Sequence, residues 1–122
     1  RVAVVGGTAH EAFLQAFYSE SDIVPYETLP EARDALRSDT VDLLFADALT
    51  LSFWLNGTAS EACCVFRGGP FHESYFFGEG MAVAVARDDD RLRQAIDAAL
   101  WELQNDGSYL EIFVRSFPLG FY

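Results

Sequence analysis

Short apolar runs alternate with amphipathic segments over the first 66 residues. The apolar runs cover residues 2–5, 22–26, 41–46 and 62–66. Between them, apolar residues recur every three or four positions, as on one face of a helix. A helix between two strands carries the chain back to the start of the next strand, so this alternation favours a parallel sheet. The sequence therefore predicts an α/β fold for this part of the chain.

The starts of three helices are marked by capping residues. Thr8 and Thr28 each precede an amphipathic segment, and Glu11 and Glu31 follow them by three positions. This spacing is the capping box, in which the threonine side chain and the glutamate carboxylate each accept a backbone N–H. Asp47 stands before a third segment and is also a favourable N-cap. We expect helices to begin directly after these three caps.

The strands and helices of this part also have predicted positions in the fold. Pro25 cannot donate a ladder hydrogen bond, so the strand at 22–26 is expected at a sheet edge or to end there. The strand at 41–46 has apolar residues on both faces, which is typical of a central parallel strand. The helical residues expected to point inward are Phe13, Leu14, Phe17, Tyr18, Leu29, Ala32 and Leu36.

The pattern changes after about residue 80, to one predicted strand at 81–87 and two helices. Asp88, Asp89 and Asp90 suit the positive end of the longer helix and do not indicate a metal site. Gly107 ends this helix, and Trp101 falls off its apolar stripe, so Trp101 is expected to be exposed. The stripe of the longer helix is Leu92, Ile96, Ala99, Leu100 and Leu103, and that of the last helix is Tyr109, Ile112, Phe113 and Phe117.

Composition excludes several functional classes. The net charge of −11 argues against a nucleic-acid partner, because binding to phosphate backbones depends on lysine and arginine. No run of 18 apolar residues is present that would suggest a membrane span. The two cysteines, Cys63 and Cys64, are adjacent and form neither a disulfide framework nor a metal-ligand spacing, so we interpret them as buried strand residues.

Two chain segments offer groups suited to a small zwitterion. The turn "GGTAHE" at 6–11 leads into a helix, whose first N–H groups attract anions. Asp47 follows another predicted strand and offers a carboxylate for a cation. Open parallel sheets bind ligands at the carboxyl ends of their strands. From the residues alone, Thr8 is as readily a plain helix cap as a ligand residue, and for Asp47 the plain cap is favoured.

Three segments in order resemble a known family. They are "VAVVGGTAHEAFL", "YETLPEARDALRSDTVDLLFAD" and "YFFGEGMAVAVARDDDRLRQAIDAALWELQNDGSYLEIFVRSF". The chain resembles the second half of family 3 extracellular solute-binding proteins, and especially the lysine/arginine/ornithine and histidine binders. The resemblance implies a type II periplasmic-binding fold, with residues 1–78 as lobe two and residues 79–122 as the crossing strand and C-terminal helices of lobe one. It further predicts that the chain is part of a longer protein.

The resemblance also implies a ligand-binding set of Thr8, Ala9, His10 and Asp47. In this family the "GT" turn grips the ligand carboxylate through N–H groups and a hydroxyl, and an aspartate at the position of Asp47 grips the α-ammonium. Here Ala9 offers only its N–H, and His10 stands where the family often has glutamine. No catalytic residue, metal ligand or cofactor is predicted.

The implied function is that of a periplasmic substrate-binding protein, which takes a polar amino acid to an ABC permease in the membrane. One alternative is an enzyme similar to prephenate or arogenate dehydratases, with His10 and Asp47 as acid–base groups. Another is the ligand-sensing input domain of a larger receptor. The apolar stripes after residue 80 need covering, and a homodimer through residues 81–122 is the expected solution.

Overall fold

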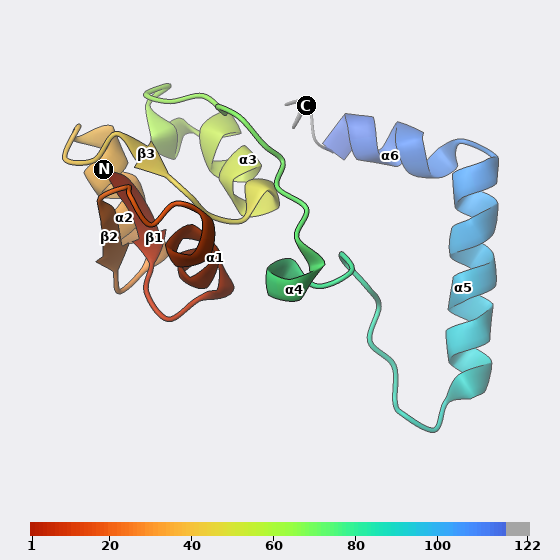
Figure 1. Cartoon of the computed structure of the whole chain (residues 1–122). Helices are drawn as coiled ribbons and strands as arrows, with labels where there is room; N and C mark the ends of the chain where they lie inside the picture. The colour runs from red at the N-terminus through yellow and green to blue at the C-terminus, as the bar shows by residue number, and fades with distance from the viewer. Residues whose placement is uncertain (117–122) are drawn as a thin grey trace. The chain divides into compact units, whose positions relative to one another are not determined.

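The computed structural model describes residues 1–116, and the chain divides into two compact units. The first unit runs from Arg1 to Gly80, and the described part of the second covers residues 81–116. Figure 1 shows the elements of each unit. None of the described helices combines the length and the apolar character that crossing a membrane requires.

The first unit is built on a small parallel sheet. Strands β1 (Val2–Val5), β2 (Ile23–Tyr26) and β3 (Leu43–Leu44) lie in the order β2-β1-β3, and β1 is parallel to both neighbours. The helical elements of this unit are α1 (Ala9–Phe17), α2 (Leu29–Arg37), α3 (Ala48–Asn56), the 3-10 turn η1 (Thr58–Ser60) and α4 (Ser74–Phe77). The predicted parallel α/β architecture is confirmed, and so is the edge position of the strand that contains Pro25.

The threonine caps form where the sequence predicts them. The Thr28 hydroxyl accepts the Glu31 N–H at 3.4 Å, and Glu31 accepts the Thr28 N–H at 3.3 Å, which completes a capping box. Thr8 likewise accepts the Glu11 N–H at 3.4 Å. The Glu11 carboxylate, however, accepts the N–H of Gly7 at 2.7 Å, so the predicted second half of this capping box is wrong by one residue.

The core lies on both faces of β1. Ala3 is fully buried in a cluster with Ala32 and Ala35 of α2 and with Val41, and half-buried Leu36 packs against this cluster. Val4 is also fully buried, and strand alternation turns it to the opposite face. Among residues 1–116, the other buried apolar side chains are Phe13 and Leu14 of α1 and Leu51 and Trp54 of α3.

The predicted inward faces are only partly correct. Phe13, Leu14 and Ala32 are buried, and Leu29 and Leu36 are half-buried. Phe17 remains 58% exposed and Tyr18 41% exposed, since they stand at the last residue and the C-cap of α1.

Two predicted strands of the first unit need correction. The strand expected at 41–46 is regular only at Leu43–Leu44, and within the described sheet it lies at an edge instead of the centre. The segment 62–66 is not a strand, and its cysteines are not buried strand residues: Cys63 is exposed, Cys64 is half-buried, and the two form a disulfide with each other. Successive side chains of a strand point to opposite faces, so adjacent cysteines joined by a disulfide cannot continue one.

The described part of the second unit, residues 81–116, contains two helices, α5 (Asp90–Asn105) and α6 (Ser108–Ser116). Asp89 caps α5 by accepting the Leu92 N–H at 3.0 Å, and Gly107 follows the helix with a φ of 83°, as its role as terminator predicts. Trp101 is 67% exposed, also as predicted.

The strand predicted at 81–87 is wrong, because this segment has no regular structure and no partner strand among the described residues. A strand needs a neighbour to satisfy its backbone groups. No residue of α5 or the described α6 is buried in this chain, and Phe117 of the predicted stripe lies outside the described residues.

Candidate ligand-binding site

The first part of the candidate site is the turn between β1 and α1. The Thr8 hydroxyl donates to the Val5 carbonyl oxygen at 2.7 Å and accepts the Glu11 N–H at 3.4 Å. Thr8 is therefore an N-cap, and its hydroxyl proton is already donated to the Val5 carbonyl oxygen. The N–H groups of Ala9 and His10 have no hydrogen-bond acceptor within residues 1–116. As first-turn groups at the positive end of the helix, they are suited to an anion.

The second part is Asp47, which follows β3 and caps α3. Its Oδ1 atom accepts the Thr50 N–H at 2.7 Å and the Thr50 hydroxyl at 2.6 Å. The side chain is exposed. The expectation that a helix starts at Asp47 is confirmed.

A pocket of about 490 Å³ in the first unit lies between these two parts. Ala9, His10 and Asp47 line it, whereas Thr8 does not. The carboxyl ends of β1 and β3 are neighbours in the sheet, which is why residues 37 positions apart, His10 and Asp47, reach the same pocket. The remaining lining residues are Leu44, Phe45, Ala46, Ala48, Leu51, Phe66, Arg67, Gly68, Gly69, Pro70, Phe71, Phe76 and Phe77.

The His10 ring is held between aromatic side chains. Its centroid lies 5.6 Å from the Phe45 ring, edge-on, and 5.2 Å from the Phe77 ring. Burial lowers the pKa of His10 below its ordinary value, and the negative charge of Asp47 partly opposes this shift. The imidazole is therefore neutral at pH 7 and offers one N–H donor and one acceptor nitrogen.

Sequence reasoning missed the aromatic wall of this pocket. Phe13 of α1 lies at the centre of the cluster, with ring centroids 5.4 Å from Phe45, 5.6 Å from Phe71, 5.7 Å from Phe76 and 5.2 Å from Phe77. Three of these rings, those of Phe71, Phe76 and Phe77, come from residues 66–77, a segment that contains α4. The density of aromatic residues in "FRGGPFHESYFF" was the available signal.

Arg67 is a second lining residue that the sequence reasoning passed over. It adds a cation to the pocket wall, and within residues 1–116 its guanidinium makes no hydrogen bond or ion pair. The pocket thus joins anion-binding groups, namely helix N–H donors and a guanidinium, to one carboxylate. Nowhere in residues 1–116 do three or more His, Cys, Asp or Glu side chains gather as they would around a metal ion.

Comparisons with known proteins found relatives that are named as amino-acid-binding proteins. The chain is 28% identical over 117 residues to the putative ABC transporter arginine-binding protein 2 of Escherichia coli K12, covering 96% of this chain and 47% of that protein. It is 25% identical over 123 residues to the lysine/arginine/ornithine-binding periplasmic protein of the same strain, covering 99% of this chain and 47% of that protein. It is 25% identical over 124 residues to the histidine-binding periplasmic protein of Salmonella typhimurium, covering 100% of this chain and 48% of that protein.

This chain is a relative of periplasmic amino-acid-binding proteins. The resemblance to solute-binding proteins that the sequence suggested is confirmed by these relatives, although no family model matches the chain. The chain spans about half the length of the curated relatives it matches. These relatives are named as binding proteins and not as enzymes.

Proposed function

We propose that this protein is the substrate-binding component of an ABC importer, which takes up a polar amino acid or similar small zwitterion in the periplasm. Its partner in the membrane is an ABC permease. The relatives supply the class of protein, since each is named for the amino acid it binds and several are named as periplasmic or as ABC transporter proteins. The pocket supplies the chemistry.

We assign residues 1–78 to lobe two of a type II periplasmic-binding fold, and residues 79–122 to the crossing segment, which is not a strand here, and the C-terminal helices of lobe one. The three-stranded parallel sheet of the first unit and the division of the chain after Gly80 support this assignment. In this arrangement the candidate pocket is the lobe-two half of an inter-lobe cleft.

The observation that carries the proposal is the pairing of an anion site and a cation site in one pocket. Ala9 and His10, whose N–H groups have no acceptor within residues 1–116, line this pocket together with Asp47. An amino acid presents a carboxylate and an ammonium a few ångströms apart, and charge-assisted hydrogen bonds satisfy both. Thr8, which does not line the pocket, contributes to ligand binding by capping α1 and fixing the turn, and its hydroxyl proton is held by the Val5 carbonyl oxygen.

We infer that the protein binds its ligand without transforming it. His10 and Asp47 are the two lining residues whose side chains are of the types that serve as general acids and bases. Since His10 is neutral and Asp47 already caps α3, both have roles in positioning a ligand that need no chemistry.

In this 122-residue chain, the apolar faces of α5 and α6 need another surface to cover them. We assign it to a second copy of the chain, which forms a homodimer through residues 81–122. The support is that no residue of these helices is buried, although Leu92, Leu100 and Ile112 are large apolar side chains exposed by 47%, 38% and 49%.

Calorimetric titration of the protein at its natural length tests the function. Arginine, lysine, ornithine and histidine are the first ligands to titrate. We expect micromolar or tighter binding of at least one of them. For the amino acid that binds, the decarboxylated amine and the deaminated acid should each bind at least tenfold more weakly, because each leaves one charged site unpaired. Equal affinity for an amino acid and its decarboxylated amine would refute the carboxylate site at α1.

A further inference from the structure

We propose that Cys63 and Cys64 form a redox-controlled site that decides whether residues 62–66 join the sheet as a fourth strand beside β3. In the structure the two cysteines are joined to each other by a disulfide, and the segment has no regular structure. The same five residues, "ACCVF", form an apolar run of the kind that pairs in a parallel sheet.

The disulfide and the strand exclude each other. In a strand, neighbouring side chains point to opposite faces of the sheet, so the two sulfur atoms would be held on opposite sides of the backbone. A bond between them requires both sulfurs on one side. The oxidised pair therefore keeps 62–66 out of the sheet, and two thiols remove that restriction.

The outer edge of β3 has no partner strand in the described sheet. The N–H groups of Leu43 and Phe45 donate to Arg1 and Ala3 on the β1 side, at 3.1 and 2.9 Å. The intervening Leu44 therefore turns its N–H to the opposite side, because backbone groups alternate along a strand. Within the described sheet no strand occupies that side, and the Leu43 side chain stays 51% exposed.

The segment already lies beside this edge. A cavity of about 430 Å³ has Leu43 and Leu44 of β3 on its wall together with residues 63–67. The connection from β3 runs through α3 and η1, the kind of helical crossover that joins parallel neighbours. Docking of 62–66 would close this cavity against β3.

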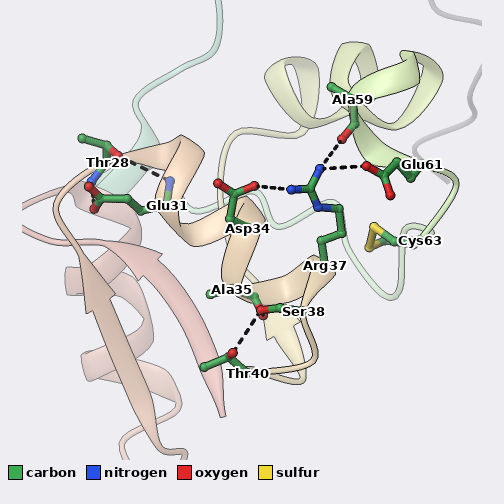
Figure 2. A network of polar contacts seen from close by, with 11 residues as sticks. Thr28, Glu31, Asp34, Ala35, Arg37, Ser38, Thr40, Ala59, Glu61 and Cys63 are labelled. Carbon is green, nitrogen blue, oxygen red and sulfur yellow. Dashed lines mark hydrogen bonds and ion pairs between the residues drawn. A yellow bond between two sulfur atoms is a disulfide. The ribbon is translucent and has the colours of Figure 1, made fainter.

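Figure 2 shows the polar contacts that Arg37 makes at the entry to this segment. The Arg37 guanidinium of α2 donates to the Ala59 carbonyl oxygen and to the Glu61 carboxylate, both at 3.3 Å, so η1 and the next residue are tied to α2. Glu61 and Ala62 then turn with φ values of 52° and 54°. The chain thus turns directly before Cys63, at residues that follow a segment bonded to α2.

The redox step is a thiol–disulfide exchange with a dithiol reductant. A thiolate of the dithiol attacks one sulfur and forms a mixed disulfide, which its second thiol resolves. The Cys63–Cys64 bond receives two electrons and two protons and becomes two thiols, while the dithiol becomes a disulfide. Phe66 and Arg67 line both this cavity and the candidate ligand pocket, so docking would also reposition one wall of that pocket.

Amide hydrogen exchange, followed by NMR on the whole chain, tests the proposal without any ligand. On complete reduction with dithiothreitol, verified by a mass gain of two hydrogens, exchange of the Leu44 amide should slow at least tenfold. Amide NOEs should appear between Leu44 and residues 62–66. The Phe45 amide is the internal control, because its bond to Ala3 exists in both states. The double variant Cys63→Ser, Cys64→Ser should match the reduced protein with and without dithiothreitol.

Three outcomes would overturn the proposal. One is a fully reduced protein whose Leu44 amide exchanges as fast as in the oxidised protein. Another is a folded double serine variant that behaves like the oxidised form. The third is a protein that keeps two free thiols after exposure to an oxidant. None of these measurements uses an amino acid. A result that refutes the redox-controlled strand therefore leaves the proposed transport function untouched.

Discussion

Asp47 caps helix α3 with a single carboxylate oxygen, because Oδ1 accepts both the N–H and the hydroxyl of Thr50, at 2.7 and 2.6 Å. Its other oxygen, Oδ2, makes no hydrogen bond within residues 1–116 and belongs to a residue that lines the candidate pocket. Capping and ligand binding are therefore compatible roles for this side chain. The two interpretations that the sequence left as alternatives for Asp47 do not compete in the structure.

Asp47→Asn separates these roles, because asparagine caps a helix as well as aspartate but carries no charge. Asp47 is exposed without a ligand, but we expect affinity to fall at least tenfold, since loss of one partner of a charge pair that becomes buried on binding costs about 2–5 kcal/mol. Calorimetry on the protein at its natural length measures the change. Asp89→Asn, which neutralises the N-cap of α5 outside the pocket, is the matched control and should leave affinity unchanged. Equal affinities in both variants would remove Asp47 from the site.

The pKa of His10 provides a test of the pocket's electrostatics. Burial lowers it and the Asp47 charge raises it, with burial the larger cause. We expect an NMR titration of the imidazole to give a pKa below the ordinary value of about 6.5. In Asp47→Asn it should fall further, because the opposing charge is gone. An unchanged His10 pKa in that variant would show that the two groups are not coupled.

The same shift makes stability depend on pH. The folded state binds a proton at His10 less readily than the unfolded state does. The contribution of neutral His10 to the free energy of unfolding is therefore complete above about pH 6.5, and it is lost as pH falls through the lowered pKa of the folded state. Urea unfolding at pH 7.5, 6.5 and 5.5 should show a declining free energy. His10→Gln should show a smaller decline over this range. A decline of the same size in His10→Gln would assign the pH dependence to other groups.

Thr8 and Thr28 form a matched pair of helix caps, one beside the pocket and one outside it. Thr8→Ala and Thr28→Ala should each lower the free energy of unfolding by about 1 kcal/mol. Only Thr8→Ala should also weaken ligand binding, because only that cap fixes the turn with the Ala9 and His10 N–H groups. Unfolding curves and calorimetry on the same two variants check both parts. A Thr28→Ala variant that loses affinity equally would reduce the Thr8 effect to general destabilisation.

The apolar faces of α5 and α6 predict self-association of this 122-residue chain. Burying one leucine or isoleucine side chain contributes about 1.5–3 kcal/mol, so several exposed side chains favour a dimer. Light scattering at micromolar concentration should give twice the monomer mass. Ile112→Glu, on the apolar stripe of α6, should shift the chain towards monomer, whereas Leu110→Glu, off that stripe, should not. A wild-type monomer at these concentrations would contradict the dimer.

The features that the sequence determined are local ones. Thr8, Thr28 and Asp47 were identifiable as caps because each acts on a backbone N–H three residues away. The short apolar run at Val2–Val5 and the helical spacing after it likewise report structure within a few residues. The candidate residues Ala9, His10 and Asp47 followed from the resemblance together with the rule that parallel strands present ligands at their carboxyl ends.

The features that only the tertiary structure decided depend on partners distant in the chain. A strand exists only where a neighbour satisfies its backbone, so apolar runs at 62–66 and 81–87 could not reveal that they stay unpaired in the described structure. The contact of Phe13 with Phe71 and Phe77 joins segments about 60 residues apart, which no local spacing encodes. The pKa of His10 has the same origin, because its main cause is burial beneath side chains that the fold brings from elsewhere in the chain.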